Sequence, residues 1–152
     1  MLELLQALPI SDVMRRSTWL FPAIEVLHLA GIAMVLGTVI VVDLALLGIL
    51  RSPALRTAVT PLLAVTKCGI AIAALSGALL FVSDPLEFWN NPAFRLKLLA
   101  FALAIANALI FQHFTRGSPE ITALGPLKRL SISASLLLWC SVLVLGRAIA
   151  YV

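Results

Sequence analysis

The chain has 152 residues, 62% of them hydrophobic, and carries a formal net charge of +4. Soluble domains are about 45–50% apolar, so this composition, with a mean hydropathy of +1.10, excludes a water-soluble globule of this size. The basic residues flank the apolar runs and form no patch interleaved with exposed aromatic residues. The positive charge therefore indicates contact with lipid headgroups and excludes nucleic acid as a partner. We expect an integral membrane protein that forms one transmembrane domain over residues 1–152.

The elements predicted along the chain are all helical. Residues 1–16 alternate apolar and polar side chains around Pro9, which predicts a short amphipathic helix in the membrane interface. Four apolar runs long enough to cross a bilayer follow, at about 18–50, 61–82, 92–115 and 127–151. The fold class predicted is therefore all-α: an integral membrane four-helix bundle with a short N-terminal interfacial helix.

Four spans place both termini on the same side of the membrane. Lys and Arg residues are slightly more numerous on the opposite side. By the positive-inside rule, this balance favours a cytoplasmic location for the opposite side and a periplasmic one for the termini.

Small residues follow one face of the second span, where Gly69, Ala73 and Gly77 recur at four-residue spacing. Such a stripe lets the backbone of a neighbouring helix approach closely. The third span carries alanine at every second position from 100 to 108. Tight helix packing is one interpretation of these small side chains, and room for a flat cofactor such as a porphyrin is the other.

The first apolar run contains three ionisable residues, Glu25, His28 and Asp43. Ionisable side chains at bilayer depth are costly and mark functional sites or specific polar contacts. At ~1.5 Å per residue, three polar residues lie ~18 Å from the basic residue that marks the terminal side of their span. These residues are His28, Asn107 and Ser135, and we expect them to form one polar layer near the middle of the membrane.

The two histidines, His28 and His113, invite the hypothesis of a b-type haem. Their depths differ by ~9 Å, which argues against one iron held by both. A haem on His28 with another sixth ligand, with none, or shared across a symmetric oligomer avoids this objection. A covalent c-type haem is excluded because the chain has no Cys-x-x-Cys-His motif. The residues predicted to contact the haem are His28, Asn107, Ser135, Lys97 and Arg147.

Two alternatives for His28 stay open at this point. The spacing Glu25-x-x-His28 places a carboxylate and an imidazole on one helix face, as in helix-borne metal sites, although the chain has one such motif instead of two. In a structural role, His28 would hydrogen-bond Asn107 or Glu25 and fix the helix register.

Other charged residues fall near the two ends of the bundle. Asp43, Lys67 and His113, joined by Arg116, are predicted to form a second polar cluster on the side opposite the termini, either a salt bridge or a proton-transfer chain. Lys97 lies just inside the terminal side, where its stem is expected to snorkel to the interface. The other roles open to it are contact with Glu25 or with a haem propionate.

Two stretches resemble a family of small bacterial inner-membrane proteins with four helices that is classed as a domain of unknown function. One runs from Trp19-Leu-Phe-Pro22 through His28 to Asp43-Leu-Ala-Leu-Leu-Gly48, and the other from Gly77 to Asn91-Pro92-Ala-Phe94-Arg-Leu-Lys97. The resemblance implies the fold and singles out His28, Asp43 and Lys97. In that family Asp-Leu is followed by Arg, whereas this chain has Ala45.

The function that we predict is electron transfer by a b-type haem protein of the bacterial inner membrane, with haem b near His28. Its partners would be the lipid bilayer, a quinone or a redox partner protein, and a second copy of the chain in a homo-oligomer. The alternative is a non-redox proton or ion carrier, or an accessory subunit, in which the buried polar residues are structural.

Overall fold

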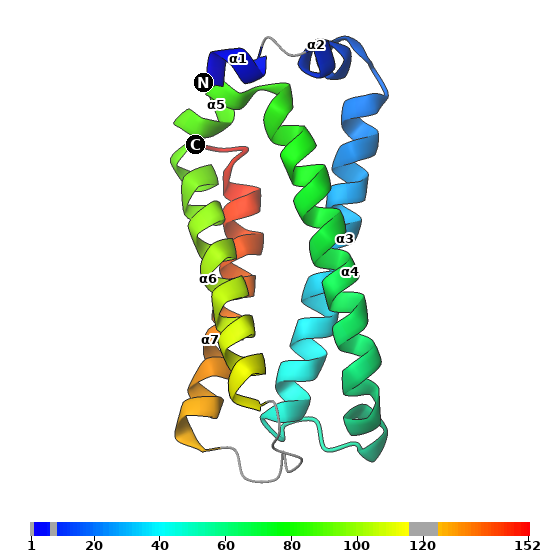
Figure 1. Ribbon diagram of the computed structural model, residues 1–152, viewed down its shortest axis with the longest axis vertical. Coiled ribbons are helices and arrows are strands. Elements are labelled where there is room, and N and C mark those ends of the chain that lie inside the picture. The colour runs from blue at the N-terminus through cyan, green and yellow to red at the C-terminus, as the bar shows by residue number, and fades with distance from the viewer. Residues whose placement is uncertain (1, 7–8, 116–124) are drawn as a thin grey trace.

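The computed structural model describes residues 2–6, 9–115 and 125–152. Within these residues the chain forms helices and no strand (Figure 1). The helices are α1 (Leu2–Gln6), α2 (Pro9–Arg16), α3 (Leu20–Leu46), α4 (Pro53–Ser83), α5 (Pro85–Asn90), α6 (Pro92–Thr115) and α7 (Pro126–Ala148). Four of them, α3, α4, α6 and α7, are long and apolar enough to cross a membrane. The predicted all-α bundle with four candidate spans is confirmed.

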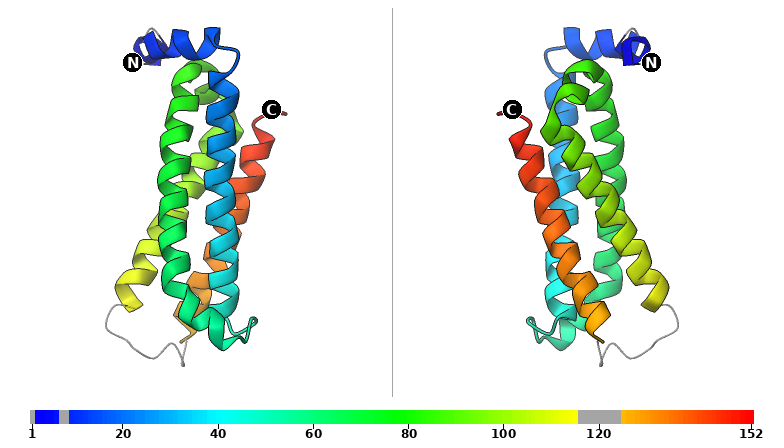
Figure 2. Two further views of the ribbon diagram at one scale, coloured as in Figure 1. Left: turned by 90° about the vertical axis from the view of Figure 1, so that its right-hand side faces the viewer. Right: turned by 90° about the vertical axis from the view of Figure 1, so that its left-hand side faces the viewer.

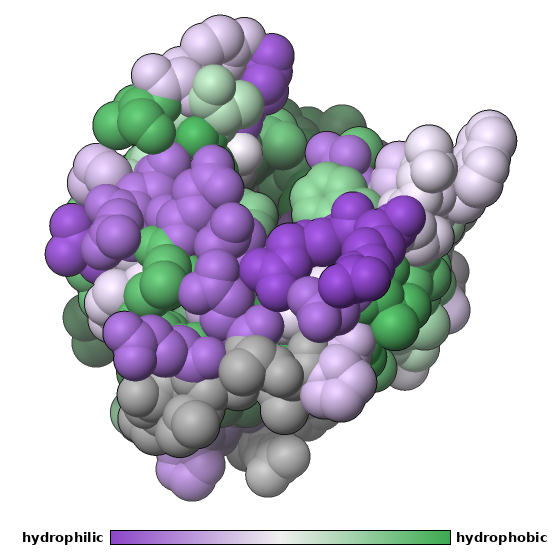
Figure 3. Space-filling model, turned by 90° about the horizontal axis from the view of Figure 1, so that it is seen from above, coloured by the Kyte–Doolittle hydropathy of each residue, from purple (hydrophilic) through white to green (hydrophobic). Residues whose placement is uncertain are grey.

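The four long helices form two hairpins. Helix α3 packs mainly on α4, and α6 packs mainly on α7, while contacts between α3 and α7 join the two hairpins. Figures 1 and 2 show both termini at one end of the bundle, where α1, α2 and α5 lie across the ends of the long helices. Viewed from above, polar residues gather over this terminal end (Figure 3). We call the other end, where α3 leads into α4, the distal end.

Helix α2 is fixed to the terminal end by its buried face. Ser11 and Met14 are buried against the bundle, whereas Asp12, Val13 and Arg16 are exposed. The Ser11 hydroxyl donates a hydrogen bond to the Val82 carbonyl near the end of α4. The amphipathic pattern of the N-terminal segment thus covers the bundle with one face and turns its charges outward.

The stripe of small residues on α4 brings α3 and α4 into backbone contact. A Cβ atom added at Gly31 would lie 2.7 Å from the Ala73 nitrogen, and one at Gly69 would lie 2.9 Å from the Gly31 oxygen. Distances this short leave no room for a larger side chain or for a ligand between the helices. At Gly31 and Gly69, the stripe therefore serves close helix packing.

A small apolar core ties the two hairpins together. It consists of Val35 and Val39 on α3, Ala104 on α6 and Trp139 on α7. The Phe101 ring meets the Trp139 ring edge-on, with 5.9 Å between centroids. Many other large apolar side chains are exposed, as expected when lipid, and not water, surrounds the helices.

The helix ends near the distal end differ from the predicted span limits. Helix α3 ends at Leu46, before Gly48, which adopts a φ of 76° that favours glycine and breaks the helix. Helix α4 begins at Pro53 and continues through Pro61, whereas the sequence predicts that the span starts at about residue 61. A proline inside a helix removes one hydrogen bond, and here the helix tolerates that loss.

Candidate functional site

His28 on α3 is half-buried and turns its ring toward α4. Its Nδ1 lies 2.9 Å from the Ala73 carbonyl oxygen and 3.1 Å from the Ser76 hydroxyl. A carbonyl oxygen only accepts hydrogen bonds, so Nδ1 carries the proton and donates it to Ala73. The Ser76 hydroxyl in turn donates to the Ile72 carbonyl, 2.5 Å away. The second ring nitrogen of His28, Nε2, therefore keeps its lone pair.

Gly77 makes room for the His28 ring. A Cβ atom added at this glycine would lie 2.9 Å from Cε1 of His28 and 3.3 Å from Nδ1. The small-residue stripe that brings α3 and α4 together thus also leaves space for the imidazole, at its Gly77 end. Substitution of Gly77 by any other residue forces the ring to move.

Lys97 on α6 is half-buried and turns toward α7. A Cβ atom added at Gly146 would lie 3.4 Å from the Lys97 Nζ, so the glycine leaves space for the lysine side chain. The Lys97 charge also acts on His28. The expectation that Lys97 snorkels to the interface stays a prediction, and Gly146, beside its ammonium, lies two residues from the terminal end of α7.

The Lys97 ammonium has no carboxylate within salt-bridge distance in the part of the chain that the structure describes, where the single ion pair joins Arg15 and Asp12. A cation between membrane-spanning helices favours a nearby anion, because lipid offers it no solvation. His28 and Lys97 therefore offer a nitrogen lone pair on one hairpin and a positive charge on the other. We call this pair the His28–Lys97 site.

Aromatic side chains cover this site on the terminal side. The Phe81 and Phe94 rings stack with 5.4 Å between centroids and an interplanar angle of 3°. Phe81 lies one turn beyond Gly77 on α4, and Phe94 lies one turn before Lys97 on α6. The stacked rings connect α4 and α6, whose backbones do not pack against each other over the described residues.

The predicted polar layer of His28, Asn107 and Ser135 does not form. The Asn107 amide donates to the Ser131 carbonyl at 3.0 Å and accepts from the Ser131 hydroxyl at 2.8 Å. These polar groups of α6 and α7 are therefore hydrogen-bonded to each other. Ser135 instead interacts with Asp43. The expected His28–Asn107 hydrogen bond is wrong, because depth alone does not say which neighbouring helix a side chain faces.

Glu25 is exposed on α3 and contributes no hydrogen bond to His28. In addition, no group of three or more His, Cys, Asp or Glu side chains suited to a metal ion occurs among residues 2–6, 9–115 and 125–152. The structure therefore does not assemble a Glu25–His28 metal site within one copy of the chain.

The predicted cluster of Asp43, Lys67 and His113 is not assembled either. Asp43 is buried with a relative exposure of 8%, whereas Lys67 and His113 are exposed. None of the three takes part in an ion pair with another described residue. Asp43 faces α7, while the other two side chains face outward, and Arg116 lies outside the described residues.

Arg147 lies at the terminal end of α7. Its guanidinium stacks over the Tyr151 ring, 4.6 Å from the centroid, and donates a hydrogen bond to the Tyr151 hydroxyl. The side chain is exposed and is engaged with the C-terminal residues. Its contact with a cofactor stays a prediction.

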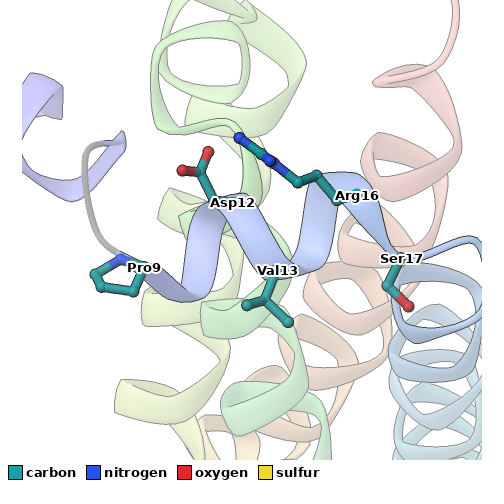
Figure 4. A pocket seen from close by; sticks show the side chains of 5 residues that line it. All are labelled: Pro9, Asp12, Val13, Arg16 and Ser17. Carbon is teal, nitrogen blue, oxygen red and sulfur yellow. The ribbon is translucent and has the colours of Figure 1, made fainter.

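The two pockets that the structure shows most clearly lie elsewhere. One, of about 570 Å³, lies beside α2 (Figure 4). It is lined by Pro9, Asp12, Val13, Arg16 and Ser17. The other, of about 520 Å³, lies along the distal end of α6 around His113. Neither is lined by His28 or Lys97, so the candidate site does not coincide with either hollow.

Comparisons with protein families, with curated proteins and with solved structures find no match to this chain. The resemblance to the four-helix family stays a prediction, and the site has to be interpreted from its own geometry. Ser76 and Gly146, which position His28 and Lys97, were not predicted from the sequence. The pattern that could have identified them is a polar or small residue within an apolar run, at the same membrane depth as an ionisable residue.

Proposed function

We propose that this protein is a membrane electron-transfer protein that holds a b-type haem at the His28–Lys97 site. The observation that carries the proposal is the hydrogen bond from Nδ1 of His28 to the Ala73 carbonyl. A histidine that ligates a metal usually donates its other ring nitrogen to a carbonyl or carboxylate, which fixes the tautomer and the ring orientation. The bond leaves Nε2 of His28 as the nitrogen available to an iron.

The set of donors at the site fits a haem. Nε2 of His28 would be the axial ligand, and the Lys97 ammonium, which lacks a carboxylate partner among the described residues, would attract a propionate. Gly77 and Gly146 leave space for these two side chains. When bound, the haem would supply a one-electron redox couple whose potential depends on its axial ligand and surroundings.

His28 would be the single histidine ligand from one copy of the chain. His113 is exposed and lines the pocket at the distal end of α6, far along the bundle from Lys97. A sixth ligand, where present, would come from a small molecule or from a second copy in a homo-oligomer. We propose that electrons pass to or from a quinone or a partner protein at the bacterial inner membrane, with the termini on the periplasmic side.

An absorption spectrum of the purified protein tests the proposal, with haem supplied in excess during expression. We expect a Soret band in the wild type, its loss in His28→Ala, and its retention in the control His113→Ala. The absence of the band from folded wild-type protein would contradict haem binding. An unchanged band in His28→Ala would contradict the assignment of the ligand.

A non-redox carrier or accessory subunit is the second candidate. It is favoured by the paired hydrogen bonds between Asn107 and Ser131, which have the form of a purely structural helix contact. The His28–Ser76 contact would then have the same role. This alternative predicts a colourless protein in which His28→Ala lowers the thermal stability and changes nothing else.

A further inference from the structure

Asp43 is a buried carboxyl group that the His28–Lys97 site does not use. Its relative exposure is 8%, and its Oδ2 atom has no hydrogen-bond partner among the described residues. The side chain that it interacts with is Ser135 on α7. Unsatisfied buried oxygens are rare, and each calls for a specific explanation.

No ion pair joins this carboxyl group to another described residue. The charged or titratable residues toward the distal end of the neighbouring helices are Arg56 and Lys67 on α4, His113 on α6, and Lys128 and Arg129 on α7, and the Arg56 side chain lies outside the described part of the structure. Lys67, His113 and Arg129 are exposed, Lys128 is half-buried, and none forms an ion pair with Asp43. A carboxylate anion would be strongly disfavoured in this environment, whereas a neutral carboxylic acid is tolerated.

The backbone around Asp43 argues against a metal cation as the neutralising group. Membrane sites for dehydrated sodium ions draw ligands from carbonyl groups where helices are broken. Asp43 lies in the last turn of α3, and the carbonyl groups of Asp43, Leu44 and Ala45 accept hydrogen bonds from the backbone that follows the helix, so they are engaged. The carboxyl group and one serine hydroxyl are too few oxygens to replace a hydration shell, but a proton needs only one of them.

Further polar groups lie beyond Ser135 on α7 and α6. On α7, Ser131 is one turn closer to the helix start at Pro126 than Ser135 is, and it occupies nearly the same face. Ser131 is hydrogen-bonded to Asn107 on α6. Ser135 lies ~13 Å from the start of α7 and Ser131 lies ~7 Å from it, so these groups descend in steps toward the distal end.

We propose that Asp43 is a proton-binding site, with its carboxyl group neutral in the resting protein. The site exchanges its proton with the distal side through the hydroxyl groups of Ser135 and Ser131. This site is independent of any haem, and it adds a proton-binding function to the half of the bundle farther from His28.

Infrared spectroscopy of the purified protein in lipid vesicles at neutral pH tests the proposal. We expect the carbonyl band of a protonated carboxylic acid to be present in the wild type and absent from Asp43→Asn. The exposed Asp12→Asn variant serves as the matched control and keeps the band. A wild type without the band would overturn the proposal, as would a band that survives in Asp43→Asn.

Three further measurements keep the proposal falsifiable. If Asp43→Asn does not fold, Ser135→Ala retains the carboxyl group and should shift the band by removing the hydroxyl that interacts with it. Replacement of choline by sodium at constant pH should leave the band unchanged, and its loss would show that a cation site is present instead. Ser131→Ala should slow hydrogen–deuterium exchange of the carboxyl several-fold relative to the exposed control Ser133→Ala, and equal rates would exclude the route.

Discussion

Helix α3 carries two ionisable residues, His28 and Asp43, that are at least partly buried and whose hydrogen-bonding surroundings differ. Near the terminal end, His28 donates one ring N–H to a backbone carbonyl and leaves the other nitrogen open beside the Lys97 charge. Toward the distal end, Asp43 interacts with one hydroxyl and has an oxygen without a partner among the described residues. The first arrangement is suited to a ligand with a metal and a negative charge. The second is suited to a proton.

The two regions also differ in how small residues are used. Gly77 and Gly146 create space for the His28 and Lys97 side chains, whereas valine and tryptophan residues fill the core between the two regions. In a membrane bundle, a glycine that accommodates a polar side chain is therefore a different feature from a glycine that allows two helices to approach.

The largest effect on this comparison is expected from Gly77→Ala. The added Cβ would lie 2.9 Å from Cε1 of His28 and would displace the ring from Ala73. We expect haem affinity to fall by about 10–100-fold, as when the group that orients a metal ligand is lost. Gly37→Ala is the matched control, because a Cβ at that glycine meets nothing within 4 Å. Haem titrations of the two purified variants measure the difference, and equal affinities would show that the space for His28 does not matter.

A somewhat smaller effect is expected from Lys97→Met. The substitution keeps the length and apolar stem of the side chain but removes the charge that would pair with a propionate. A hydrogen bond to a charged group contributes about 1.5–3 kcal/mol, so haem affinity should fall at least about tenfold. The exposed Lys67→Met is the control. If both variants bind haem like the wild type, Lys97 has no part in holding the cofactor.

The smallest effect is expected from Asn107→Leu, which removes the paired hydrogen bonds to Ser131. Hydrogen bonds between membrane helices average about 0.6 kcal/mol, so unfolding in detergent should become easier by roughly that amount for each bond lost. The Soret band should not change, because Asn107 does not contact His28. A change in the Soret band would show that Asn107 belongs to the His28–Lys97 site and would contradict the distinction between the two regions.

Much of the fold was predictable from the sequence because hydropathy and helix caps are local. Asn91 caps α6, with its side-chain oxygen accepting from the Ala93 and Phe94 nitrogens. The stripe on α4 also indicated close packing correctly. In each case the signal depends on neighbouring residues in the same helix, so no knowledge of the tertiary arrangement was needed.

The partners of the polar residues were less predictable. Counting depth along helices placed Asn107 and Ser135 level with His28. Ser135 instead interacts with Asp43, which lies ~22 Å farther along α3 than His28, so the ends of the helices are not level. Asn107 pairs within its own hairpin, and the space that Gly146 leaves for Lys97 was not predictable because Gly146 is on a distant part of the chain. His28, Asp43 and Lys97, the residues that the family resemblance singled out, are all at least partly buried.

Rescue of a ligand-deleted variant tests the central claim most directly. Haem is titrated into folded wild-type protein and into His28→Gly, each with and without free imidazole. The account predicts that the wild type binds haem with a Soret band, that His28→Gly does not, and that imidazole restores the band in the variant. Binding that is equal in the two proteins without imidazole, or absent from the wild type, would contradict the assignment of His28 as the haem ligand.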